Sequence, residues 1–159
     1  MLFRSARGLA ELTRLGYKPR PPASRAPDMF FSGTAAQRAD ELLAALSDPH
    51  ASAVVCTRGG YGVSTLLNAI SKHPHASPRI LLGYSDLTSL QILLWQKLGW
   101  VTFYGPMVAA GFDAGADAPG GYDLASFKRA VTETASGWHL ELRGEALVLG
   151  SAEGTLLGG

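Results

Sequence analysis

The sequence is short of excess charge, of cysteine and of long hydrophobic runs. Its 14 lysines and arginines nearly balance 13 acidic residues, so we expect no surface for nucleic acid or an anionic membrane. The single cysteine, Cys56, cannot form an internal disulfide or a cysteine-based metal site, which favours a reducing, cytoplasmic setting. No apolar run reaches the roughly 20 residues that a membrane helix needs. We therefore expect a soluble protein.

The residues that are present predict one globular α/β domain. Hydrophobic residues make up 47% of the 159 positions, enough for a single substantial core. Hydrophobic spacing and turn signals predict helices at 5–15, 34–48, 63–70, 87–98 and 123–134, and strands at 53–57, 79–83 and 100–104. Alternating strands and helices favour βαβ units, and hence a mainly parallel sheet with flanking helices.

The two ends of the chain differ from this pattern. A helix begins almost at residue 1, where an α/β domain would first have a strand, so we expect the first strand to be missing. After Gly137 the period changes to two, which predicts a hairpin of strands 138–142 and 146–149. We expect an α/β domain over 1–135, and over 136–159 the hairpin and the start of a linker in a truncated chain.

Glycine-rich or polar turns follow each predicted strand, at 58–62, 84–86 and 105–107. The carboxyl ends of parallel strands share one edge of a sheet, where ligands bind, so these turns should meet. Ser85, on a strand-to-helix turn, would present its hydroxyl beside unpaired helix N–H groups that can stabilise an oxyanion. One candidate donor is the N–H of Asp86, and the glycine turn at Gly60 offers a second.

Each motif alone leaves alternatives open. Ser85 by itself is more simply a helix N-cap, because Gly-Tyr-Ser-Asp lacks the second glycine of the common nucleophile elbow. The Arg-Gly-Gly-Tyr-Gly turn could be a tight turn or a phosphate loop, although it lacks the Lys and Ser/Thr of a P-loop. Arg58 could bind a substrate carboxylate or pair with Asp86 to join the two loops.

Taken together, the motifs resemble those of the LD-carboxypeptidase family of serine peptidases, which includes the microcin C self-immunity peptidases. The likeness rests above all on Arg-Gly-Gly-Tyr-Gly at 58–62 followed by Gly-Tyr-Ser-Asp at 83–86, and runs from about Gly8 to Gly159. It implies the N-terminal domain of a two-domain cytoplasmic enzyme. Such an enzyme removes the terminal D-alanine from peptidoglycan tetrapeptides, cutting an L,D bond during cell-wall recycling.

The resemblance implies a role for particular residues. Ser85 matches the nucleophile, and the backbone N–H groups of Asp86 and Gly60 match the oxyanion hole. We predict Arg58 and Tyr84 as substrate contacts. In the family a Glu and a His from a C-terminal domain complete the triad. None of the histidines here matches that position: His50, His73, His75 and His139.

We therefore expect this chain alone to be an inefficient peptidase, because loss of triad members leaves a small part of the rate enhancement. We expect no metal and no cofactor. The expected partner is a peptidoglycan-derived peptide, with a homodimer as a further option. Two other functions stay open: a catalytically inactive ligand-binding or interaction module that keeps the pocket, and a peptide-nucleotide amidase of the microcin type.

Overall fold

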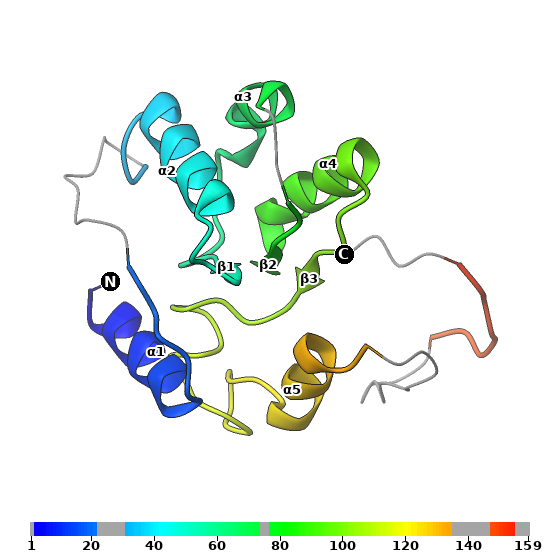
Figure 1. The fold of residues 1–159 in the computed structure, drawn as a ribbon. Helices are drawn as coiled ribbons and strands as arrows, with labels where there is room; N and C mark the ends of the chain where they lie inside the picture. The colour runs from blue at the N-terminus through cyan, green and yellow to red at the C-terminus, as the bar shows by residue number, and fades with distance from the viewer. Residues whose placement is uncertain (1, 22–30, 74–76, 135–146, 155–159) are drawn as a thin grey trace.

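The computed structural model describes residues 2–21, 31–73, 77–134 and 147–154. The predicted alternation of helices and strands is confirmed (Figure 1). The elements, with two short 3-10 helices named η1 and η2, follow in this order: α1 (Leu2–Arg14), α2 (Ala35–Ser47), β1 (Ala53–Val55), η1 (Val63–Thr65), α3 (Leu67–Lys72), β2 (Ile80–Gly83), η2 (Ser85–Leu87), α4 (Thr88–Leu98), β3 (Phe103–Tyr104) and α5 (Leu124–Thr132).

The three strands form one parallel sheet in the order β1-β2-β3, as the sequence predicts. Gly83, at the end of β2, lies opposite Tyr104 of β3. Hydrogen bonding continues past the end of β1, because the N–H of Cys56 donates to the carbonyl oxygen of Leu82 at 3.0 Å. The N–H of Val108 in turn donates to the Cys56 carbonyl at 3.0 Å. The segment after β3 is thereby held against the end of β1.

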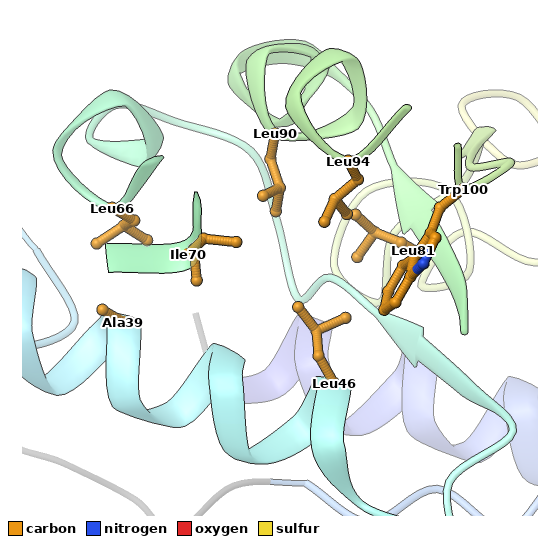
Figure 2. Close-up of a cluster of buried hydrophobic side chains, with 8 residues drawn as sticks. All are labelled: Ala39, Leu46, Leu66, Ile70, Leu81, Leu90, Leu94 and Trp100. Carbon is orange, nitrogen blue, oxygen red and sulfur yellow. The ribbon is translucent and has the colours of Figure 1, made fainter. Parts of the chain in front are cut away.

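Two adjacent leucines of β2 bury opposite faces of the sheet, because successive side chains of a strand alternate. Leu81 packs with side chains from α2, α3 and α4 and from residues next to α3 and α4, in a cluster that Figure 2 shows: Ala39, Leu46, Leu66, Ile70, Leu90, Leu94 and Trp100. Leu82 packs with α1, α5 and the loop between β3 and α5 in a second cluster: Leu12, Val108, Phe112, Tyr122 and Phe127. Figure 1 accordingly shows α2, α3 and α4 on one side of the sheet, and α1 and α5 on the other.

Helix α2 begins with the capping box that Thr34 and Gln37 predict. The Thr34 hydroxyl accepts a hydrogen bond from the Gln37 N–H at 3.2 Å, and the Gln37 side chain accepts one from the Thr34 N–H at 2.9 Å. Two free N–H groups of the helix start are satisfied in this way.

Two predicted boundaries differ from the structure. The helix expected over 63–70 is divided into η1 and α3, and its 3-10 start follows Gly62, whose φ of +108° is left-handed. The strand expected over 100–104 is only β3. Trp100 instead turns into the core, 5% exposed, directly after the left-handed helix cap at Gly99.

The predicted hairpin falls partly outside the described residues. Its first strand and its turn lie there, and so does residue 146. The described residues 147–149 form no strand, and the side chains of Leu147, Val148 and Leu149 are 98%, 88% and 89% exposed. Without packing partners, an apolar alternation does not determine a strand pairing. The division of the chain at residue 135 stays a prediction.

Helix α1 is held against the loop after β3 by a close backbone contact and by charge. A Cβ atom at Gly8 would lie only 1.8 Å from the carbonyl oxygen of Val108. Arg4 donates a hydrogen bond to the carboxylate of Asp113, a residue that is 4% exposed. Glycine at position 8 therefore lets the helix approach this loop.

A second polar contact joins α1 to the same loop. The Tyr122 hydroxyl donates a hydrogen bond to Glu11 at 2.7 Å, and the Arg14 guanidinium pairs with the same carboxylate. The hydrogen bond from Arg14 is the main cause that lowers the pKa of Glu11 to about 2. Burial raises the pKa of Tyr122, and the Glu11 carboxylate raises it further.

Gly8→Ala should destabilise the fold by about 1–3 kcal/mol, because the new methyl group overlaps the Val108 carbonyl. An alanine in an exposed helix would instead add about 1 kcal/mol of stability. Urea unfolding followed by circular dichroism measures the sign of the change in the free energy of unfolding. Ala10→Gly, at an exposed position of the same helix, is the control and should destabilise by about 1 kcal/mol. A more stable Gly8→Ala protein would contradict the contact.

The stabilisation from Glu11 should be present above its unfolded pKa near 4.5 and should be lost as the pH falls toward 2. The sign follows because the folded pKa lies below the unfolded one, so protonation favours unfolding. Glu11→Gln should lower the thermal midpoint at pH 7 and make little difference near pH 2. An equal difference at both pH values would mean that the carboxylate charge is not the cause.

Candidate functional site

The three predicted turns meet at the carboxyl edge of the sheet. Gly59 is the point of contact, because a Cβ atom there would lie 3.0 Å from Cβ of Ser85 and 3.5 Å from Cε of Met107. One glycine therefore touches the turn after β2 and the turn after β3. The parallel register brings these segments together, as the sequence predicts.

Ser85 lies at the tip of β2 in a strained conformation. It is the first residue of η2 and has a φ of +70°, whereas the other positive-φ residue besides glycine in the described chain is Asp117. A left-handed conformation costs a residue with a Cβ atom about 1–2 kcal/mol. Such strain at a strand-to-helix turn is the geometry that exposes the serine of a nucleophile elbow.

The Ser85 side chain is not a helix cap. Tyr84 occupies the N-cap position of η2, and no side-chain capping bond forms there or at the start of α4. Ser85 is exposed, and within the described part of the chain its hydroxyl makes no hydrogen bond, to a histidine or to any other residue. Its oxygen is therefore available to a ligand.

Two backbone N–H groups beside Ser85 are also available. Among the described residues, neither the N–H of Asp86 nor that of Gly60 donates a hydrogen bond. Gly60 has a φ of +146°, and apart from its chain neighbours no described residue has an atom within 4 Å of the position that a Cβ would take there. Both groups can donate to a developing negative charge on a bound carbonyl. Their role as oxyanion donors stays a prediction.

The Asp86 side chain joins the turn after β2 to the glycine turn. Its Oδ2 accepts a hydrogen bond from the Val63 N–H at 2.8 Å. Arg58, which is exposed, donates from Nε to the carbonyl oxygen of Gly59 at 3.2 Å. Asp86 therefore links the two loops through a backbone group. The predicted contact of Arg58 with substrate is untested.

Gln91, which the sequence motifs do not single out, is 3% exposed. Its Nε2 donates to the carbonyl oxygens of Gly83, at 3.0 Å, and of Phe103, at 2.9 Å. One side-chain amide thus holds β2 and β3 together two residues before Ser85. The available signal was a glutamine directly after Leu90, on the apolar face of a helix.

Tyr84 lines a groove beside the site. Its ring lies 5.8 Å from the ring of Tyr104, centroid to centroid. Both rings border an open groove of about 540 Å³, whose other walls include Pro106, the segment 120–123 and the inner face of α5. The predicted substrate contact of Tyr84 would therefore be made in this groove.

The described residues contain no group of three or more His, Cys, Asp or Glu side chains that could hold a metal ion. His75 and His139 lie outside the described residues. None of the described helices is both long enough and apolar enough to cross a membrane.

Comparisons with known proteins give one consistent family. A sequence model described as the LD-carboxypeptidase N-terminal domain matches residues 3–105. The probable murein peptide carboxypeptidase of Bacillus subtilis is 35% identical over 136 residues, 82% of this chain and 41% of that protein.

Two solved structures are similar. MccF in complex with glutamyl sulfamoyl guanosine has a TM-score of 0.68 at 28% identity, over 88% of this chain and 43% of MccF. The muramoyltetrapeptide carboxypeptidase from Oxalobacter formigenes has a TM-score of 0.65 at 25% identity, over 82% of this chain and 44% of that one. The chain spans less than half the length of each of these relatives.

Substitutions at Ser85 should reveal the backbone strain. Ser85→Gly should be more stable than Ser85→Ala by about 1 kcal/mol, because glycine adopts a φ of +70° without the Cβ penalty. Urea unfolding of both variants measures the difference. At Ala44, an exposed position inside α2, the order should reverse, with alanine more stable than glycine. If alanine were the more stable residue at both positions, residue 85 would not be strained.

Proposed function

Because this chain belongs to the LD-carboxypeptidase N-terminal domain family, we propose that it carries the nucleophile of a serine peptidase acting on murein tetrapeptides. The observation that carries the proposal is the strained, exposed Ser85, whose hydroxyl makes no hydrogen bond to a described residue and which has Gly59 directly beside it. The reaction would remove the terminal D-alanine in the cytoplasm during peptidoglycan recycling.

In the proposed mechanism, Ser85 Oγ attacks the carbonyl carbon of the scissile L,D bond. The carbonyl electron pair moves onto oxygen, where the N–H groups of Asp86 and Gly60 stabilise the negative charge. A histidine oriented by a glutamate, both supplied by the C-terminal domain that the family resemblance implies, takes the hydroxyl proton and passes it to the leaving amine. The carbon–nitrogen bond then breaks and D-alanine leaves, after which water hydrolyses the acyl-enzyme and regenerates Ser85.

Arg58 is the proposed contact for the free carboxylate of the terminal D-alanine. A carboxypeptidase has to recognise that group, and a guanidinium binds a carboxylate through two parallel hydrogen bonds. Arg58 is exposed, and it directly precedes the glycine that touches Ser85. Tyr84 would contact the peptide from the groove beside it.

A peptide-nucleotide amidase is the second candidate, because a similar structure is that of MccF with bound glutamyl sulfamoyl guanosine. The names of the Bacillus and Oxalobacter relatives favour murein peptides instead. Both activities would use Ser85 and the same oxyanion donors. The two candidates therefore differ in substrate and share the chemistry.

The test joins this chain to the part of the Bacillus relative that follows the matched region. The fusion should release D-alanine from a murein tetrapeptide, measured by chromatography. Ser85→Ala in the fusion should lower kcat by at least about a thousandfold, because the nucleophile is lost. An aminoacyl sulfamoyl nucleoside assayed in parallel distinguishes the two substrates.

Circular dichroism of both fusions provides the control for folding. A folded fusion that cleaves neither substrate would contradict the proposal and favour a non-catalytic binding module. Equal activity of the wild-type and Ser85→Ala fusions would show that another residue is the nucleophile.

A further inference from the structure

One peptide unit beside the site is hydrogen-bonded at both of its polar atoms by charged side chains. It is the unit between Gly62 and Val63. Its carbonyl oxygen accepts from Arg38 Nη1 at 3.2 Å and from the Thr65 hydroxyl at 2.6 Å. Its N–H donates to Asp86 Oδ2 at 2.8 Å. The two charged residues belong to α2 and η2, on either side of the glycine turn.

The hydrogen bonds to this peptide unit restrain the glycine turn at 58–62, whose own backbone is conformationally free. Gly60 and Gly62 have φ values of +146° and +108°, and glycine backbone is the least restricted in a protein. Gly62 is buried, and a Cβ atom there would lie 2.8 Å from Arg38 Nη1, so the guanidinium lies directly against the backbone. Arg38 is itself placed over the ring of Phe31, 4.6 Å from its centroid.

The other end of the turn is fixed by packing. Gly59 contacts Ser85 and Met107, as described above. Only Gly60 and Tyr61 lie between this contact and the bonded peptide unit. Two anchors, one on each side of Gly60, therefore restrict the directions that its N–H can take.

We propose that Arg38 and Asp86 are positioning residues that aim the Gly60 N–H at the same point as the Asp86 N–H. The inference rests on the proposed function, in which both N–H groups bind the oxyanion. Asp86 then has two separate roles, one through its backbone and one through its carboxylate. Hydrogen bonds that involve a charged group are about twice as strong as neutral ones, so this pair of anchors suits a turn that has to stay rigid.

Amide hydrogen exchange of the chain itself tests the anchors without any assay of activity. In Asp86→Ala the Val63 N–H should exchange at least about tenfold faster, because it loses its acceptor. Asp86→Asn keeps an oxygen at the same reach and should stay within about threefold of wild type. An unchanged exchange rate of the Val63 N–H in Asp86→Ala would contradict the claim that the Asp86 carboxylate anchors this peptide unit.

Kinetics of the fusion test the positioning role. Asp86→Ala and Arg38→Met should each lower kcat about tenfold and change KM less than about twofold, because a misaligned donor affects the transition state more than substrate binding. Removing one oxyanion donor entirely costs about a hundredfold to a thousandfold, so a partial loss is expected.

Thr34→Ala is the matched control, because it weakens the start of the same helix that carries Arg38. It should lower stability by about 1 kcal/mol and leave kcat unchanged. If the wild-type fusion is active and both positioning variants keep its kcat, the inference is wrong and the proposed function stands. If the wild-type fusion is inactive, the proposed function fails, and the positioning role fails with it.

Discussion

The buried amide of Gln91 is the interaction on which the geometry of the site depends. It bonds the carbonyl of Gly83, the last residue of β2, and the carbonyl of Phe103, the first residue of β3. A buried amide that loses its partners costs about 1–3 kcal/mol, so the two strand ends cannot easily shift relative to each other. Ser85 lies two residues after Gly83, so its position depends on this fixed end of β2. The turn after β3 contains Met107, which contacts Gly59, and it begins at the other strand end that Gln91 holds.

At the carboxyl edge of the sheet, rigid surroundings hold one strained residue, Ser85. Ser85 keeps an unfavourable φ because the strand before it, the helix after it and Gly59 beside it leave little room to relax. On the far side of the sheet, α1 holds the loop after β3 through Gly8, which accounts for a glycine inside a helix. The core clusters on both faces therefore support a site that itself adds little to stability.

The parts of the fold that could be predicted are those that local patterns determine. Strand and helix alternation, the capping box at Thr34 and the meeting of the turns follow from periodicity and parallel pairing. The bond from Arg38 to Gly62 spans 24 residues and that from Val63 to Asp86 spans 23, so no local pattern encodes them. The predicted strand begins at Trp100, but burial of its ring in the core prevails there over strand propensity. At Ser85 the sequence left two alternatives, and the backbone conformation decides against the cap.

Gly59 and Gly60 are adjacent, yet the structure favours glycine at each for a different reason. At Gly59 the limit is volume, because a methyl group would crowd the turn that carries Ser85. At Gly60 the described residues leave space for a Cβ, and the limit is handedness, because a φ of +146° has the opposite sign to the φ of an ordinary extended residue. A residue of D configuration would adopt that backbone angle readily while keeping its N–H. The site therefore restricts side chains at one glycine by crowding and at the next by the handedness of the backbone.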